Sequence, residues 1–317
     1  MKTIICCLIL AVQLHAQTVA TLEPSPTGKQ QVIWEKFKSS ISEIDRNLDG
    51  VLGIAIEDLQ TGQRLFLHEN EVFPQASTIK IALLAELYHQ AQLSAQGASG
   101  KAKLSDLYTM QASDLVPDSD IMQGLTPSIT RVTNRDLATM VVAVSDNSAT
   151  NVLIDRVGME NVNALMAANG LEHTRLRRKM MDLKAASEGR ENVSTPREMM
   201  TLLESIYKEK LLNHEMSQDY LKLLSTHKDS WIPRDLPPDL RVANKPGALE
   251  GVRNDSGIVF AQNRPFVICV MTTYLGSERD GEEAISKISL AAYRMFSRVG
   301  NASEYGRVIS VGNGNSR

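Results

Sequence analysis

Strand-like patterns lie near the two ends of this chain and enclose a long helical middle. From about residue 77 to residue 225, apolar residues recur at helical spacing. Amphipathic helices are also predicted at 31–47 and 281–299. Runs rich in β-branched and aromatic residues, typical of strands, occur at 51–56, 64–67, 241–244, 257–260 and 266–273. This order predicts an α/β (α+β) fold, in which an antiparallel sheet is flanked by N- and C-terminal helices and carries an inserted all-helical subdomain.

The N-terminus has the form of a secretory signal peptide over residues 1–16. Lys2 precedes a short apolar run, and the small Ala16 marks the expected cleavage point. The run is too short to cross a bilayer, and no later segment approaches the length of a membrane span. We therefore expect an exported protein, periplasmic or extracellular, without a membrane span.

The rest of the chain divides into three parts by composition. The proline-containing stretch 17–30 is interpreted as a linker, and 301–317 as a loose tail. Residues 31–300 between them are predicted to form one folded domain. The expected subdivisions of that domain are a sheet part at about 31–75 and 235–300 and a helical part at about 77–230.

Charge and cysteine content narrow the possible partners. With 34 Lys and Arg against 37 Asp and Glu, the net charge is -3, which gives no basis for binding nucleic acid. Cys269 is the single cysteine outside the signal peptide and lies in an apolar run, so we expect a core residue and no disulfide. Zinc-peptidase, P-loop and G-x-S-x-G signatures are absent and the histidines are scattered, so neither a metal nor a cofactor is expected.

One short motif, Ser77-x-x-Lys80, precedes an apolar helical pattern. If Ser77 opens that helix, Lys80 lies one turn further on the same face, and its amine can reach the hydroxyl. A buried, partly neutral lysine can then activate the serine as a nucleophile. The alternative is a helix cap followed by a solvated lysine, because the same spacing recurs at 205–208 and 225–228.

Two further motifs follow in order along the chain. A Ser-Asp-Asn triplet begins at Ser145 between two helical patterns, and a Lys-Pro-Gly triplet begins at Lys245 in a predicted strand. Asp146 of the first triplet is also expected to cap the helix after it. With the motif at Ser77, this order resembles the class A β-lactamases and the related penicillin-binding D-alanyl peptidases, over roughly residues 31–300.

The resemblance implies a role for each matching residue. Ser77 would be the acylated nucleophile, Lys80 would activate it, and Ser145 would pass a proton to the departing amide nitrogen. The backbone N–H groups of Ser77 and Ala248 would form the oxyanion hole. A glycine is expected beside them, because a side chain there would block the approach of the backbone to the acyl group. The implied substrate-binding residues are Asn147, Lys245 and Gly247.

Two departures from the family pattern bear on the chemistry. Pro246 stands where the family has Thr or Ser, and it offers neither a hydroxyl nor an N–H to a substrate carboxylate. Carboxylate binding then rests on Lys245 and Arg253, unless Arg253 is a solvated strand residue. The family's T-R-L-x-R-x-E pattern matches from Thr174 onward, but Met180 replaces the glutamate that activates the deacylating water.

The expected function is that of a secreted serine hydrolase that opens β-lactam amides through a Ser77 acyl-enzyme, with efficient deacylation in question. Asp182 is the nearest carboxylate that can replace the missing base. Three alternatives stay open: a D-alanyl-D-alanine carboxypeptidase, a sensor that stays acylated, and a hydrolase of an unrelated amide or ester. The expected partner is a small β-lactam or a peptidoglycan stem peptide, and we expect a monomer.

Overall fold

The computed structural model describes residues 28–307. Its centre is a five-stranded antiparallel sheet in the order β2-β1-β9-β8-β7. The strands of this sheet are β1 (Val51–Asp58), β2 (Arg64–Leu67), β7 (Val242–Leu249), β8 (Val252–Val259) and β9 (Phe266–Thr273). Early and late strands therefore meet where β1 pairs with β9, and the predicted fold class is confirmed.

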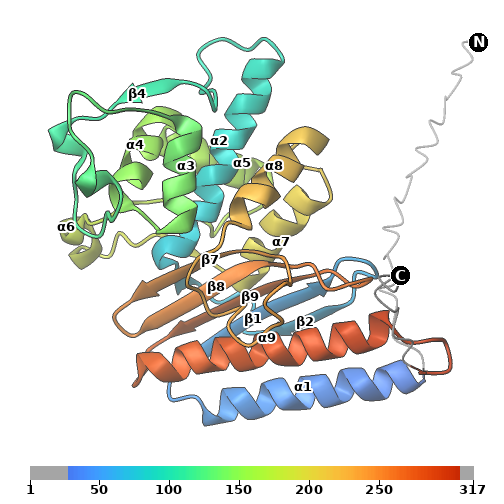
Figure 1. The fold of residues 1–317 in the computed structure, drawn as a ribbon. Helices are drawn as coiled ribbons and strands as arrows, with labels where there is room; N and C mark the ends of the chain where they lie inside the picture. The colour runs from blue at the N-terminus through green and yellow to red at the C-terminus, as the bar shows by residue number, and fades with distance from the viewer. Residues whose placement is uncertain (1–27, 308–317) are drawn as a thin grey trace, which may run out of the picture.

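Two long helices, α1 (Lys29–Asn47) and α9 (Glu278–Gly300), cover one face of the sheet (Figure 1). Their apolar sides pack on the sheet, and the ring of Phe296 on α9 stacks on Phe266 of β9 with centroids 4.6 Å apart. Helix α1 begins at Lys29, inside the stretch expected to be a linker. The predicted signal peptide and the last ten residues of the predicted tail, 308–317, lie outside the described residues.

The helical part covers the opposite face of the sheet (Figure 1). Its helices are α2 (Lys80–Ala95), α3 (Asn134–Ala143), α4 (Asn147–Val157), α5 (Met159–Ala168), α6 (Leu183–Ser187), α7 (Pro196–Tyr207) and α8 (His214–Leu224). This part is not entirely helical. Two small strand pairs also contribute to it, β3 (Phe73–Pro74) with β6 (Val193–Ser194) and β4 (Leu107–Thr109) with β5 (Arg131–Thr133).

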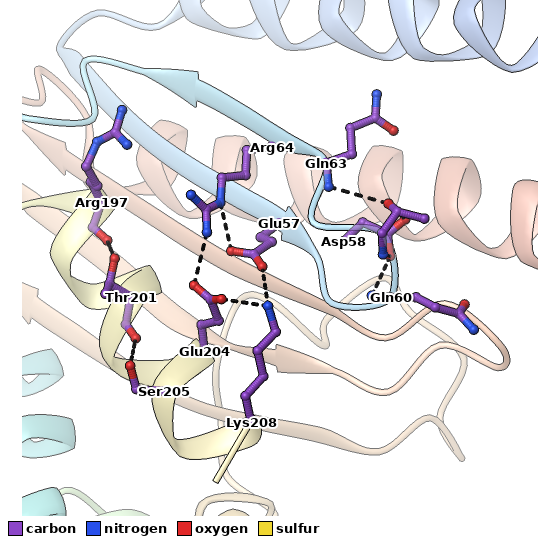
Figure 2. A network of polar contacts seen from close by, with 11 residues as sticks. Glu57, Asp58, Gln60, Gln63, Arg64, Arg197, Thr201, Glu204, Ser205 and Lys208 are labelled. Carbon is purple, nitrogen blue, oxygen red and sulfur yellow. Dashed lines mark hydrogen bonds and ion pairs between the residues drawn. The ribbon is translucent and has the colours of Figure 1, made fainter. Parts of the chain in front are cut away.

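A network of four charged side chains joins the helical part to the sheet (Figure 2). Glu57 on β1 pairs with Arg64 of β2 and Lys208 after α7, both at 3.0 Å. Glu204 of α7 pairs with the same two cations, at 3.2 Å and 2.6 Å. The side chain of Glu57 is fully buried, and this burial raises its pKa against the opposing hydrogen bond from Lys208. Each carboxylate depends on both cations, so the four residues hold α7 on the sheet as a unit.

Two further expectations concern the described part of the chain. Among residues 28–307, no helix combines the length and the apolar character that a membrane crossing requires. Cys269 is buried in β9, as expected for a core residue, and burial raises the pKa of its thiol to about 12.

Candidate active site

A cavity of about 430 Å³ lies where the edge strand β7 faces the helical part. Its wall brings together residues that are far apart in the sequence. Those expected from the motifs are Ser77, Ser145, Asn147, Lys245, Gly247 and Ala248. Lys80 lies beneath this wall and is fully buried. The three motifs thus meet at one cavity.

Ser77 lies in a short 3₁₀ turn, η1 (Ala76–Ile79), and α2 begins only at Lys80. The expected helix therefore starts one turn later than the serine, although Ser77 O still accepts the backbone N–H of Lys80. Ala76, just before the nucleophile, has φ of 48°, a left-handed conformation that is unfavourable for a residue with a Cβ. This strained backbone holds Ser77 half-exposed on the cavity wall.

The amine of Lys80 is held by the Ser-Asp-Asn triplet. Its Nζ donates to the carbonyl oxygen of Ser145 at 2.6 Å, to Ser145 Oγ at 3.0 Å and to Asn147 Oδ1 at 2.9 Å. Burial lowers the pKa of Lys80 well below its ordinary value, and the charge of Lys245 lowers it further. This shift increases the share of the neutral amine, the form that a general base requires, although the three donated hydrogen bonds correspond to the charged form.

Ser145 connects the two buried lysines. Its Oγ accepts from Lys80 Nζ and from Lys245 Nζ, each at 3.0 Å. Its φ is 60°, and this left-handed conformation presents both its carbonyl and its hydroxyl to Lys80. A hydroxyl bonded to two amines can pass a proton between them and a third group.

Lys245 belongs to the edge strand β7 and is 1% exposed. Burial lowers its pKa to about 7, and the positive charge of Lys228 contributes to this shift. Its Nζ also donates to the carbonyl of Pro246 at 3.0 Å. Because β7 is an edge strand, the missing N–H of Pro246 costs no more than an unpaired edge position would.

The structure gives a second reason for a glycine at position 247, beside the one expected from the resemblance. A Cβ on Gly247 would lie 2.7 Å from the Gln75 carbonyl oxygen, from Thr78 N and from Thr78 Oγ1. These atoms belong to the turn that carries the nucleophile, and Thr78 Oγ1 also donates to the Lys245 carbonyl at 3.4 Å. The absence of a side chain therefore lets β7 lie directly against η1 and brings the strand to Ser77.

Asp146 has the structural role expected of it. Its Oδ1 accepts from Ala149 N at 2.9 Å and caps α4. Its other carboxylate oxygen accepts from Ile121 N at 3.1 Å and Met122 N at 2.9 Å. This carboxylate thus ties the start of α4 to the neighbouring loop and positions the adjacent Ser145 and Asn147.

The loop that carries a glutamate in the family pattern has a buried methionine here. Met180 is 7% exposed, and Asn151 of α4 bonds to both its backbone N–H and its carbonyl. Asp182 is exposed, and its side chain caps α6 by accepting from Ala185 N at 2.9 Å. Neither Met180 nor Asp182 is among the residues that line the cavity.

Arg253 lies on β8 opposite Ala248, outside the lining of the cavity. Its guanidinium pairs with Glu278 and with Glu282 of α9, the latter at 3.0 Å. A substrate carboxylate would have to compete with these two ion pairs for Arg253.

The sequence motifs did not indicate several residues of the cavity wall. These are Asp118, Asp120, Val144, Asp229 and Trp231. None belongs to a motif, and their proximity to Ser77 arises from loop packing. Among residues 28–307, no group of three or more His, Cys, Asp and Glu side chains is arranged to hold a metal ion.

Comparison with known proteins agrees with this geometry. The model of the β-lactamase enzyme family matches residues 36–296. β-Lactamase SME-1 of Serratia marcescens is 27% identical over 241 residues, which cover 74% of this chain and 79% of that protein. An ancestral class A β-lactamase superposes with a TM-score of 0.74 at 26% identity, covering 82% of this chain and 100% of the other.

A third similar structure is a mutant of PBP-A, solved as its acyl-enzyme complex with penicillin G. It has a TM-score of 0.73 at 25% identity and covers 83% of this chain and 96% of that one. The family match spans most of the chain, and both structures superpose on more than four-fifths of it. The chain therefore belongs to the β-lactamase enzyme family, among the class A β-lactamases and related penicillin-binding serine hydrolases.

Proposed function

We propose that Ser77 is acylated by β-lactams and that the acyl-enzyme is hydrolysed slowly. The observation that carries the first half is the hydrogen-bonded series Lys80, Ser145, Lys245 beside the nucleophile. These residues supply a buried amine, a hydroxyl and a second amine within one cavity. That set is sufficient to move the proton that acylation of a serine requires.

In the acylation step, the neutral amine of Lys80 takes the proton of Ser77 Oγ while that oxygen bonds to the lactam carbonyl carbon. The Ser145 hydroxyl gives its proton to the lactam nitrogen as the C–N bond breaks, and Lys245 restores that proton. The backbone N–H groups of Ser77 and Ala248 would stabilise the oxyanion. The product is an ester on Ser77 and an opened ring that carries a secondary amine.

The proposal that the acyl-enzyme is hydrolysed slowly rests on Met180, because a thioether cannot accept a proton from the attacking water. The carboxylates that line the cavity come from other loops, at Asp118, Asp120 and Asp229. The acyl-enzyme complex of the PBP-A mutant with penicillin G is a precedent for a penicillin adduct on a similar chain. We accordingly expect a long-lived penicilloyl ester on Ser77.

Intact-mass spectrometry after mixing with benzylpenicillin tests both halves. The expected result is a mass increase equal to one benzylpenicillin that persists over hours and is absent in Ser77→Ala. A transient adduct with complete conversion of the drug would show that deacylation is fast. An unmodified protein would overturn the acylation proposal and leave a hydrolase of another amide or ester.

A D-alanyl-D-alanine carboxypeptidase is the second candidate, favoured by the double contact of Ser145 with both lysines in a site without a glutamate at position 180. In such an enzyme, Lys80 and Ser145 manage both half-reactions on a stem peptide. Release of D-alanine from a synthetic peptide ending in D-Ala-D-Ala would support it. A protein that forms the penicillin adduct but releases no D-alanine would instead be a sensor.

We also propose export, with removal of residues 1–16. The support is the charged start, the short apolar run and the small residue at the cleavage point. N-terminal sequencing of the protein produced in a bacterial host with a periplasm should begin at Gln17. An intact Met1 on the protein that carries the activity would contradict the proposal.

A further inference from the structure

A second cavity, of about 600 Å³, lies beside the active-site cavity. It is enclosed by the segment 225–241 and by the start of β7. Asp229 lines both cavities. Successive strand residues point to opposite faces, and accordingly Asn244 lines the second cavity while Lys245 lines the first. The proposed acylation chemistry makes no use of the second cavity.

The main charged group in this cavity is Lys228, which is half-buried. Its Nζ donates to the carbonyl of Leu224 at 2.9 Å. Among residues 28–307, no carboxylate lies within ion-pair distance of this amine, although an ammonium group can donate three hydrogen bonds. Burial lowers its pKa to about 8, and the charge of Asp255 opposes that shift. An acceptor bound in the cavity would satisfy the remaining donors.

Ser230 provides a second unsatisfied group on the same wall. It is 5% exposed, and its buried Oγ has no hydrogen-bond partner within the described part of the chain. Leaving a buried hydroxyl without a partner is unfavourable in proteins. Both residues line the same cavity, so a ligand held by Lys228 would bring an acceptor to the side of the wall where Ser230 lies.

The remaining charges of the wall leave the cavity open to an anion. Arg234 is paired with Glu282 at 3.2 Å, whereas Arg241 lies over the ring of Phe260 and donates to Ser225 Oγ at 3.0 Å. Asp229 is the carboxylate on the wall, and it lies on the side shared with the active site. Apolar surface comes from Pro233, Leu236, Pro237, Pro238 and Leu240.

We propose that this second cavity binds an organic carboxylate, with the carboxylate held by Lys228 and Ser230 and an apolar body against the proline-rich wall. A carboxylate fits better than a phosphate, because one ammonium and one hydroxyl match a single negative charge, and the prolines and leucines of the wall can contact an apolar body. The positive charge of Lys228 is one cause of the low pKa of Lys245. An anion bound to Lys228 would offset that charge and so raise the pKa of Lys245 in the active site.

Calorimetric titration of the Ser77→Ala protein with 4-methylpentanoate tests the proposal without any need for acylation. We expect saturable binding of this carboxylate and none of the uncharged 4-methylpentanamide. Lys228→Met should weaken binding by about tenfold or more, as loss of a charge-assisted hydrogen bond does. Ser230→Ala should weaken binding to a smaller extent, and Lys245→Met should weaken it less than Lys228→Met does, because Lys245 acts on this cavity only through its charge.

An affinity in Lys228→Met equal to that of the Ser77→Ala parent would overturn the proposal. Loss of binding in Lys245→Met alone would also overturn it, because the anion would then lie in the active site. Circular dichroism melts of each variant show whether it is folded. Ser230→Ala gives an independent answer should Lys228→Met fail to fold. The titration uses a protein that lacks the nucleophile, so the absence of carboxylate binding would not bear on the proposed acylation of Ser77. In the same way, the absence of acylation would not bear on carboxylate binding in the second cavity.

Discussion

Asn151 holds Met180 by both of its backbone groups. Its Oδ1 accepts from Met180 N at 2.8 Å, and its Nδ2 donates to the Met180 carbonyl at 3.1 Å. Asn151 lies one turn after Asn147 on α4, so this contact and the one to Lys80 arise from the same face of the helix. The contacts fix the backbone of residue 180 without depending on its side chain, but that side chain is 7% exposed and packs in the core, so a substitution needs a control of equal polarity.

Met180→Glu should shorten the lifetime of the penicilloyl adduct by about 100-fold or more, because a positioned general base contributes that much to attack by water. The measurement is the decay of the adduct by intact-mass spectrometry after excess drug is removed. Met180→Gln is the matched control, since it has the size and polarity but no proton-accepting carboxylate. An equal lifetime in the Glu and Gln variants would contradict the role assigned to residue 180.

Ser145→Ala should slow acylation by about 100-fold or more, because the hydroxyl that connects Lys80 and Lys245 is lost. The second-order rate constant with a chromogenic cephalosporin, followed as single-turnover acylation, gives the effect. Ser205→Ala is the control, because Ser205 starts an equally spaced Ser-x-x-Lys pattern on α7, remote from the cavity. Normal acylation by Ser145→Ala would exclude the proton transfer through this hydroxyl.

Lys245→Met should raise the stability of the protein more at pH 6 than at pH 9. The pKa of Lys245 falls from about 10.4 in an unfolded chain to about 7 in the fold. Between these values the unfolded chain holds a proton that the folded protein lacks, so stability rises with pH in that window. Below it, the fold carries the full cost of a buried charge.

At pH 6, replacing this charge with an apolar side chain should add about 1–4 kcal/mol to the free energy of unfolding. Urea titrations at the two pH values measure the difference between variant and parent. Lys222→Met, at an exposed position on α8, is the control and should show no such pH dependence. A gain of equal size at both pH values would mean that Lys245 does not titrate in this range.

Gly247→Ala should destabilise the protein by about 1–3 kcal/mol, the range for overpacking a tight contact. Its Cβ would lie 2.7 Å from backbone atoms of Gln75 and Thr78, which belong to the turn of the nucleophile. Acylation of the folded fraction should slow as well, since β7 must move away from Ser77. In Gly124→Ala the added Cβ meets no atom within 4 Å, so thermal melting should be unchanged. Identical melting of the two variants would show that the contact of β7 with η1 is loose.

Glu57→Ala should lower the free energy of unfolding by about 1–3 kcal/mol, because Arg64 and Lys208 lose one hydrogen-bonded carboxylate but keep Glu204. The control is Glu283→Ala, which removes a partner of Arg279 and Lys287 at the surface of α9 and should leave the melting temperature unchanged. Penicillin acylation of folded Glu57→Ala should equal that of the parent. Similar melting temperatures for the two variants would assign no stabilising role to the network.

Local features of the chain were predictable because they depend on neighbouring residues. The strand predicted at 64–67 agrees with the structure residue for residue, and so does the strand predicted at 266–273. Asp146 caps α4 as its position in the triplet indicated. The exact start of α2 was missed by one turn, because the strained backbone at Ala76 is imposed by the segments packed around it.

Contacts between distant segments were not predictable in the same way. The spacing of Ser77 and Lys80 suggested a direct contact, whereas the amine of Lys80 bonds to residues 145 and 147. Gly247 is explained by the turn at residues 75–78, and the carboxylates of Asp118 and Asp229 reach the cavity from loops without a motif. Each of these depends on which surfaces meet when the helical part closes on the sheet.

The sequence by itself determined the order of strands and helices, the three motifs and the absence of a glutamate at position 180, since propensity, periodicity and residue identity are properties of short segments. Only the tertiary structure decided how the lysines share the hydroxyl of Ser145, how closely β7 approaches Ser77, and that Lys228 faces a second cavity. The physical reason is that hydrogen bonds, burial and charge interactions between residues 65 to 167 positions apart exist only once the chain has packed.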